Sequence, residues 1–527
     1  MTKYFNWHGQ HAVKVGGQLE RFGNTIDNGQ QNPNVALNWN RARTTLSQTS
    51  VRGTYGYYVV TRQYTIGNIH SNNIGFFAQD QWTPSSKLTI NYGLRTDQTN
   101  IPSYRDENQG IKFTFGQKMA PRLGFAYDIR GDGKWKGYGS WGVFYNIEQL
   151  DMPLGSFGAQ HWIQYYYTLD NYNWPAIDCE GPQGSGCPGT FIEQVDLRHV
   201  SNGQGADNLV DPNLNPYKSQ ELTFGLDHQL SRTITVGTRY THKWISEAIE
   251  DVGTQVPNVG EVFYIANPGK GLGEFPQGPE FPATPRPKRH YDGIEFRFNR
   301  RLQDNWLSNA SLLLSRTWGS YSGLTSSDEN GRNSPGVNRY YDELYLSFDQ
   351  TAKPVYGLLA SDRPFQVKLQ PAYILPWGTQ VGAEIDIESG LLQSSTVTFT
   401  GVPVFVYGRN DLGRTPVFSY TNLNFQQSVN LPKRFRATIA LNIENLFDQM
   451  AVTSRNTSPY QTALLFPGCT GGTSAANTLC ANRAFFAGFD TKAIMAANGT
   501  TVTDPRYGKD SGFQGARSAR LQLKLSF

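Results

Sequence analysis

The sequence of 527 residues contains no long hydrophobic run. No stretch approaches the roughly 18 consecutive apolar residues that a membrane-spanning helix needs. Charge is scarce, because Asp, Glu, Lys and Arg make up only 17% of the residues. The net charge is only +4, without a basic cluster, so we expect no nucleic-acid partner. These features argue against a helical bundle or coiled coil and exclude spanning helices. They leave a membrane β-barrel open, because barrel strands alternate apolar and polar residues.

Cysteine is also scarce, and the four cysteines form two local pairs in loops rich in Gly, Pro and Ser. The pairs are Cys179 with Cys187 and Cys469 with Cys480. Each pair predicts a loop closed by a disulfide, which implies an oxidising compartment. A zinc site is the alternative, but neither pair has CxxC spacing or a histidine nearby.

The dominant pattern that is present has a period of two. Leu88, Ile90, Tyr92 and Leu94 alternate with polar or small residues. The same alternation recurs at 221–230, 233–240, 380–389, 436–445 and 519–527. Successive residues of a strand point to opposite faces, so each segment has one apolar and one polar face.

This pattern predicts about fourteen strands, near residues 9–22, 72–83, 87–97, 119–130, 134–146, 217–229, 232–245, 288–301, 306–318, 362–374, 379–390, 417–430, 434–447 and 516–527. Short turns alternate with long loops near 24–72, 98–118, 148–216, 249–287, 321–359, 392–416 and 449–515. Residues 48–64 could form another strand, but it would break this alternation, so we assign them to a loop or hairpin. We predict a single all-β region over 1–527: a transmembrane antiparallel β-barrel with short periplasmic turns and long extracellular loops.

Aromatic residues recur beside the short turns. They are Trp82, Trp135, Trp306, Trp377 and Phe435, with Phe527 ending the last strand. Aromatic rings favour the boundary between membrane and water, so this set indicates an interfacial girdle. The alternative is a set of core aromatics beside the turns of a soluble sandwich.

Charged residues on strands are expected to face the lumen, because Arg or Lys facing lipid costs about 2–4 kcal/mol at the midplane. Glu384, Asp386 and Glu388 share one strand face, and we expect a polar lumen wall with these carboxylates opposite Arg434 and Arg436. A glycosidase carboxylate pair is the alternative.

The long loops carry the candidate ligand surface, since they cluster aromatic with polar residues. The candidates are Trp162, Tyr165, Tyr166, Tyr167, Tyr340 and Tyr341. Exposed aromatic rings can stack on sugars or clamp chelates and peptides. The alternative is that these loops pack on themselves over the barrel mouth.

Enzyme motifs are missing from the sequence. The eight histidines form no HExxH motif, and His11, His228 and His242 lie in strand segments. No GxSxG occurs, and GDGK at 131–134 lacks the spacing of a phosphate loop and fits a tight turn. We therefore expect no enzyme, no cofactor and no metal site.

Several segments resemble the C-terminal barrel of TonB-dependent outer-membrane receptors, especially the Oar-like branch. They are IGFFAQDQWTPSSKLTINYGLRTD (74–97), MAPRLGFAYDIRGDGKWKGYGSWGVFYN (119–146), DPNLNPYKSQELTFGLDHQL (211–230), NIENLFDQ (442–449) and the closing FQGARSARLQLKLSF. These motifs occur in family order through almost the whole chain.

The resemblance implies a 22-stranded barrel of which these fourteen strands are the last part, and uptake of an extracellular solute across the bacterial outer membrane. It also implies a plug and a TonB-type energy-coupling complex. We find no plug or signal peptide in the sequence, so we expect the C-terminal part of a receptor, a fragment or one half of a split gene, coupled to that complex only through a missing plug.

Phe527 resembles the C-terminal aromatic read by the barrel-assembly machinery. The partners expected are therefore outer-membrane lipid, this machinery, and a small-molecule, saccharide or peptide ligand that the sequence does not specify. Two other functions stay open: a surface-displayed barrel for adhesion or structure, and a secreted carbohydrate-binding β protein.

Overall fold

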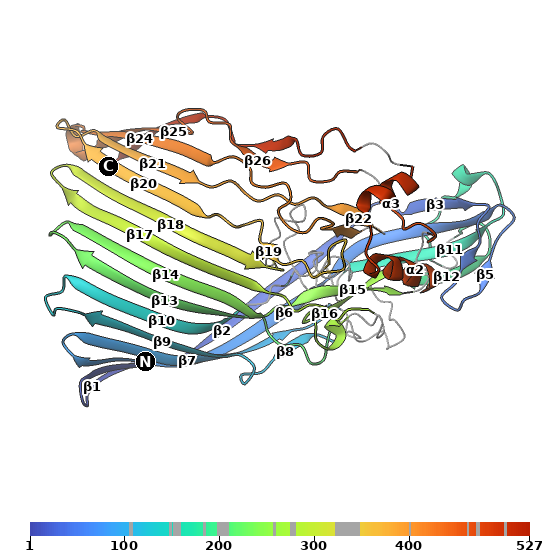
Figure 1. The fold of residues 1–527 in the computed structure, drawn as a ribbon, viewed down its shortest axis with the longest axis horizontal. Coiled ribbons are helices and arrows are strands. Elements are labelled where there is room, and N and C mark those ends of the chain that lie inside the picture. Colours follow the sequence, from blue (N-terminus) through green and yellow to red (C-terminus); the bar gives the residue numbers. More distant parts are fainter. Residues whose placement is uncertain are drawn as a thin grey trace.

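Long antiparallel strands dominate the computed structural model (Figure 1). The structure describes residues 1–104, 109–146, 150, 160–182, 186–197, 210–256, 260–274, 281–321, 348–399, 402–460, 463–470, 475–499 and 503–527. Within them, fourteen strands lie side by side in chain order in the main sheet: β2 (Gln10–Gly29), β6 (Gly56–Ser85), β7 (Leu88–Ile101), β9 (Met119–Asp128), β10 (Trp135–Tyr145), β13 (Lys218–Gln229), β14 (Ile234–Glu247), β17 (Arg289–Gln303), β18 (Trp306–Gly319), β20 (Phe365–Ile374), β21 (Gln380–Glu388), β24 (Phe418–Asn430), β25 (Arg436–Glu444) and β28 (Ser518–Ser526). The predicted antiparallel all-β fold is confirmed, and these strands match the fourteen expected from the sequence.

The remaining elements are shorter or lie outside that row. They are β1 (Thr2–Asn6), β3 (Asn34–Trp39), β4 (Arg43–Thr44), β5 (Ser50–Val51), β8 (Ile111–Phe113), β11 (Gln160–Leu169), β12 (Phe191–Asp196), β15 (Glu250–Val256), β16 (Gly260–Ala266), β19 (Gly357–Leu358), β22 (Val397–Phe399), β23 (Val402–Val404), β26 (Val452–Arg455), β27 (Asp510–Phe513), the helices α2 (Ala475–Phe486) and α3 (Thr491–Ala497), and the 3-10 turns η1 (Trp174–Ala176), η2 (Gly271–Gly273) and η4 (Pro432–Arg434). Apart from β1 and η4, they lie toward the end of the sheet with the long connections, and the short turns lie at the other end (Figure 1).

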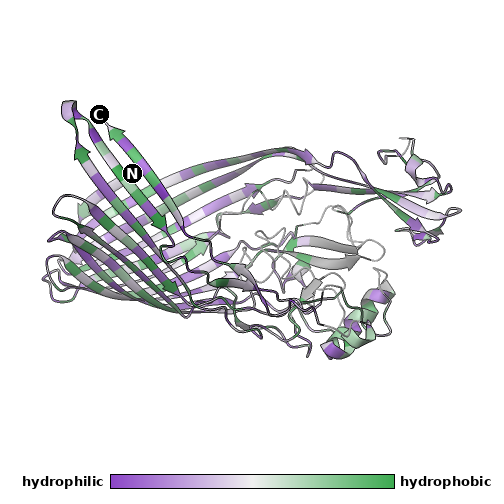
Figure 2. Cartoon of the chain, turned by 90° about the horizontal axis from the view of Figure 1, so that it is seen from above, coloured by the Kyte–Doolittle hydropathy of each residue, from purple (hydrophilic) through white to green (hydrophobic). Residues whose placement is uncertain are grey.

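The register of the sheet separates an apolar face from a polar face. Phe296 of β17 lies opposite Leu312 of β18, and its neighbour Arg297 lies opposite Ser311 on the other face. The apolar face is not covered by a second layer: Phe296 is 47% exposed, Ile439 52% and Leu523 66%. Figure 2 shows this alternation as stripes of high and low hydropathy along each strand. Apolar residues in this sheet therefore point out of the molecule.

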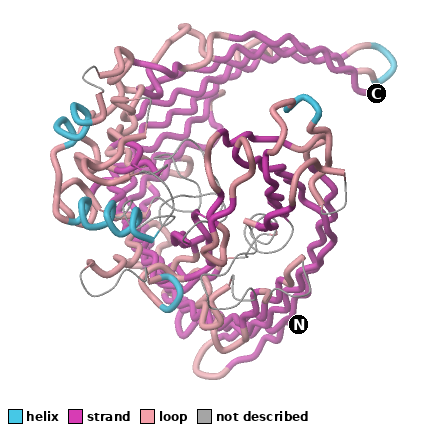
Figure 3. Tube along the Cα trace, turned by 90° about the vertical axis from the view of Figure 1, so that its right-hand side faces the viewer, coloured by secondary structure: helices cyan, strands magenta, loops and turns pink. Residues whose placement is uncertain are grey.

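The sheet curves into an arc when viewed along the molecule's long axis, with the two chain ends at opposite ends of the arc (Figure 3). At one end β1 pairs with β2, and at the other β28 pairs with β25. Within the described residues, no pairing joins β28 to β1 or β2. Every residue of β28 is exposed, as expected of an edge strand.

Several of the predicted long loops contain strands. Residues 24–72 include the end of β2, all of β3 and the start of β6, so the loop expected there is wrong. The reason is an unbroken register from Gln10 opposite Thr83 to Gly29 opposite Tyr64, which continues the hairpin beyond the predicted ends. Residues 56–64 extend β6 rather than adding a strand, so the alternation of turns is kept.

This extension forms an arm, which we define as residues 24–66, 160–182 and 186–197. β11 pairs with β6 on one side and with β12 on the other, and β3 also pairs with β6. β6 has 30 residues, whereas a strand needs only about 9–11 residues to span a membrane. The arm therefore reaches well past the rest of the sheet, at the far right of Figure 1.

Buried hydrophobic clusters stabilise the long-loop end of the molecule. One cluster packs α2 and α3 against β22 through Phe399, Phe485 and Ile494. A second joins β8 to β16 through Ile111 and Ile265. The arm has its own cluster around Tyr58, Val60 and Tyr167. The loops are thus held by local cores of their own.

Candidate functional site

The polar face of the sheet carries a network of ion pairs across β13, β14 and β17. Lys243 Nζ lies 2.8 Å from a Glu221 oxygen, and Arg239 Nη2 lies 2.7 Å from a Glu295 oxygen. Arg297 Nη2 contacts Asp227 at 2.8 Å and the Tyr138 hydroxyl at 2.7 Å. Paired charges of this kind occupy a face in contact with water or polar groups rather than lipid.

Two hollows open on this face. One, of about 390 Å³, is lined by charged side chains that include Arg239, Lys243 and Glu295 and by apolar side chains that include Trp244 and Leu313. The other, of about 620 Å³, includes Arg95, Arg122, Lys136 and Tyr138. Both are concave surfaces on the polar face of the sheet.

The predicted carboxylates lie on the polar face, but their expected partners are wrong. Glu388 pairs with Arg363 at 2.8 Å, and Asp386 lies 3.7 Å from Lys368 Nζ. Asp386 also accepts a hydrogen bond from the Tyr420 hydroxyl at 2.9 Å. Glu384 accepts one from the Asn422 amide at 3.1 Å.

Arg434 and Arg436 do not face these carboxylates, because β24 lies between β21 and β25. Arg434 is not on a strand: it ends the turn η4 and has a φ of +70°. Arg436 begins β25 opposite Asn430 and Ser526, at the short-turn end. The sequence identified the polar face but not the strand order that selects each charge's neighbour.

The six girdle aromatics all lie at the short-turn end. Trp306 is 37% exposed, Trp377 68% and Phe527 98%, and Phe435 contacts the Phe527 ring at 6.3 Å. The rings of Trp82 and Trp135 stack on the imidazoles of His11 and His228. The rings are therefore concentrated at one level of the sheet, next to the short turns.

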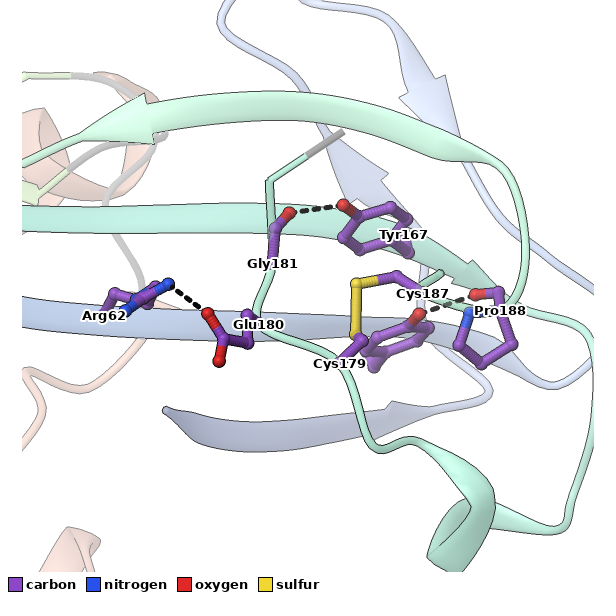
Figure 4. Close-up of a disulfide and its surroundings, with 8 residues drawn as sticks. Arg62, Tyr167, Cys179, Glu180, Gly181, Cys187 and Pro188 are labelled. Carbon is purple, nitrogen blue, oxygen red and sulfur yellow. Dashed lines mark hydrogen bonds and ion pairs between the residues drawn. A yellow bond between two sulfur atoms is a disulfide. The ribbon is translucent and has the colours of Figure 1, made fainter. Parts of the chain in front are cut away.

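Both predicted disulfides are present in the structure. Cys179 joins Cys187 in the arm, and Cys469 joins Cys480 of α2. Around the first bridge, Tyr167 donates a hydrogen bond to the Gly181 carbonyl, and Tyr58 donates one of 2.5 Å to the Pro188 carbonyl (Figure 4). Burial raises the pKa of Tyr58, so this hydroxyl stays protonated and remains a donor.

The tyrosines proposed as ligand contacts are buried in the arm. Tyr165, Tyr166 and Tyr167 are 7%, 7% and 3% exposed. Tyr165 and Tyr167 pack with Cys179 of the disulfide loop, and Tyr166 packs with Val59 and Val195. Trp162 of the same strand is half-buried. The structure favours the alternative that this segment packs on itself. Tyr340 and Tyr341 lie outside the described residues.

The sequence reading missed a group of exposed rings at the end of the arm. Trp39, Tyr55, Tyr172 and Trp174 are 44%, 39%, 71% and 56% exposed. The signal that could have found them is the recurrence of asparagine beside aromatic residues, in Asn-Trp-Asn at 38–40 and Asn-Tyr-Asn-Trp at 171–174.

Comparison with known proteins decides the family. A model described as "TonB dependent receptor-like, beta-barrel" matches residues 2–446. The chain belongs to this TonB-dependent receptor family. The TonB-dependent transporter Oar of Myxococcus xanthus is 25% identical over 435 residues, which are 76% of this chain and 38% of the relative. The chain thus spans well under half the length of this relative.

One solved structure shows the same fold. The outer membrane transporter YddB from Escherichia coli superposes with a TM-score of 0.51 at 11% identity, over 86% of this chain and 50% of that chain. The ferric-catecholate import receptor Fiu from E. coli gives a TM-score of 0.42 at 12% identity, over 87% of this chain and 51% of that chain.

Membership in the TonB-dependent receptor family places this sheet in the bacterial outer membrane as an integral barrel. The uncovered apolar face therefore contacts lipid, and the short-turn end with its aromatic girdle is the periplasmic side. The family is one of receptors and transporters rather than of enzymes.

No helix among the described residues is long and apolar enough to cross a membrane. In the same part of the chain, no three His, Cys, Asp or Glu side chains gather where they could hold a metal ion.

Proposed function

We propose that this chain forms the C-terminal barrel part of a TonB-dependent outer-membrane receptor that takes up an extracellular solute and performs no chemistry of its own. The observation that carries the proposal is the match of the receptor barrel family to residues 2–446. The polar face supports it, because its ion pairs and hollows suit the lumen of a barrel that encloses water, a plug and a passing solute.

The proposed partners follow from this role. A TonB-type energy-coupling complex would act through a plug that the fourteen-stranded sheet does not supply. The two edge strands β1 and β28 would pair with the remaining strands of a larger barrel. Phe527, which directly follows the exposed edge strand at the periplasmic side, would be the aromatic that the barrel-assembly machinery reads.

Solute uptake can be measured in the host bacterium without knowing the ligand. A strain lacking this chain and the same strain complemented with it are grown in one medium, and the solutes left in the medium are quantified by mass spectrometry. We expect at least one solute to be depleted only by the complemented strain, and this depletion to stop when a protonophore removes the energy supply.

The arm favours a second candidate function, display of a surface for adhesion, because it extends well beyond the membrane-spanning length. The same two strains separate the candidates. Equal depletion of every solute, together with loss of attachment to a surface in the deletion strain, would contradict uptake and favour adhesion.

A further inference from the structure

The tip of the arm, which we define as residues 38–40, 52–56 and 168–174, brings together parts of the chain that are more than 100 residues apart in sequence. Trp39 of β3 lies opposite Gly56 of β6, and Gly56 lies opposite Leu169 of β11. The three strands therefore end at the same level, and they bring residues 38–40 next to residues 170–174. The tip lies at the end of the arm farthest from the periplasmic turns (Figure 1).

Tyr55 links the aromatic ring of residues 38–40 to the rings of residues 170–174. Its ring lies edge-on to Trp39 with centroids 6.5 Å apart, and edge-on to Tyr172 with centroids 6.3 Å apart. Trp174 follows in η1, and its backbone N–H donates to the Tyr172 carbonyl at 2.8 Å. The rings of Trp39, Tyr55 and Tyr172 thus form one contiguous group, and Trp174 lies two residues beyond Tyr172.

Asp170 fixes the loop that carries Tyr55. Its carboxylate accepts hydrogen bonds from the Thr168 hydroxyl at 2.5 Å and from the Thr54 backbone N–H at 2.8 Å. These bonds lower the pKa of Asp170, so the carboxylate stays ionised. Gly56 has a φ of +133°, and a Cβ there would lie 2.1 Å from the Asn38 carbonyl oxygen, so only glycine allows this close approach of β6 to β3.

Some aromatic residues of the arm are buried and others are exposed. It buries Tyr58, Tyr165 and Tyr167 around the Cys179–Cys187 loop, yet leaves Tyr172 71% and Trp174 56% exposed. Clustered apolar surface left in water marks an interaction site. Because neighbouring strands and the Asp170 hydrogen bonds hold the loop in place, a ligand would meet rings that are already positioned.

The side chains between the rings indicate the chemistry of the ligand. Asparagines precede and follow Trp39 and Tyr172, and residues 38–40 and 171–174 contain no charged residue. Of the charged residues beside these segments, Arg52 donates to the Asn40 side-chain oxygen at 2.5 Å, Asp170 accepts the hydrogen bonds described above, and Arg41 follows Asn40. An amide both donates and accepts, as sugar hydroxyls do, and an aromatic face suits the C–H face of a sugar ring.

We propose that the tip of the arm binds a neutral extracellular polysaccharide, with Trp39, Tyr172 and Trp174 stacking on sugar rings and the flanking asparagines hydrogen-bonding to their hydroxyls. This surface lies outside the membrane and apart from the hollows of the polar face. Binding there captures a polymer at the cell surface whether or not the receptor imports it.

The test uses the protein in outer-membrane vesicles prepared from its host. Vesicles with wild-type chain, vesicles with the double variant Tyr172→Ala/Trp174→Ala and vesicles lacking the chain are run through gels containing dextran, laminarin or galactomannan, with acidic alginate as a charged comparison. We expect wild-type vesicles to be retarded by at least one neutral polymer. The double variant should lose about tenfold in affinity for that polymer, which corresponds to about 1.4 kcal/mol.

Phe447→Ala is the matched control, because Phe447 is 68% exposed and lies in the loop after β25, away from the arm. It should retain wild-type affinity. Because Tyr172 and Trp174 are exposed, replacing them by alanine should leave the buried cluster of the arm intact. An unchanged heat-induced gel shift of the double variant would show that the receptor is still folded. Retardation by alginate alone, no retardation by any neutral polymer, or equal binding by the double variant would overturn the proposal.

Discussion

Replacing Arg414 by alanine is expected to destabilise the extracellular end of the sheet by about 3 kcal/mol, near the lower end of the range for breaking a buried ion pair. Arg414 pairs with Asp362, whose side chain is 2% exposed. The guanidinium also donates to the backbone carbonyls of Asp362 and Gly390, at 2.7 and 3.2 Å. Without it, the Asp362 carboxylate keeps the Thr317 N–H as a donor but loses its counter-charge.

The pair holds together the connections that leave β18, β20, β21 and β24, so its loss should loosen that end locally. Hydrogen exchange of the receptor in isolated outer membranes measures the effect, as faster exchange around residues 357–364 and 389–416. Adding Asp362→Asn to Arg414→Ala should recover part of the loss, because no charge is then left buried.

A surface pair provides the comparison. Glu180 lies 3.0 Å from Arg62 and is 74% exposed, so Glu180→Ala should cost less than about 1 kcal/mol. Equal exchange rates in wild type and Arg414→Ala would show that the Arg414 contacts do not stabilise this end.

Introducing arginine on the apolar face is expected to have the second large effect. Leu312 of β18 faces lipid opposite Phe296, and Leu312→Arg places a charge in the hydrocarbon region. The expected cost is about 2–4 kcal/mol. We expect a smaller fraction of heat-modifiable, folded receptor in the outer membrane, measured by gel mobility before and after boiling.

Asn309→Arg is the matched control on the same strand. Asn309 lies on the polar face opposite Asn299 and Gln370, and it lines a hollow of about 570 Å³. An arginine there remains in a polar environment, so the folded fraction should stay near that of wild type. A similar loss for both variants would mean that the two faces of β18 do not differ in their surroundings.

The strands of the membrane part could be predicted from the sequence, because each of them has one face that contacts lipid and therefore carries apolar residues at alternate positions. Leu521, Leu523 and Leu525 alternate with polar residues, and the structure exposes all three. The alternation of apolar and polar residues is less informative where both faces of a strand are covered by protein or both are exposed to water. The arm begins beyond the lipid region. Residues 48–64 had the pattern of a strand, but the sequence did not indicate that they continue β6 back to Gly56.

The candidate site was harder to predict, because it depends on contacts between distant segments. The run Tyr165–Tyr167 resembled an exposed loop, but β6, more than 100 residues earlier, pairs with it and buries it. The sequence suggested Arg434 and Arg436 as partners of Glu384, because it does not reveal that β24 lies between β21 and β25. Burial and strand neighbours are properties of the assembled sheet, which no local pattern records.

The central claim is that the apolar face of this sheet contacts lipid. Single cysteines carrying nitroxide labels at residues 309 to 314 of β18, in receptor held in lipid bilayers, test it through collisions with oxygen, which concentrates in lipid, and with a water-soluble nickel chelate. Our account predicts a period of two, with oxygen contact greatest at positions 310, 312 and 314 and nickel contact greatest at 309, 311 and 313. The opposite phase, or no alternation over these six positions, would contradict it.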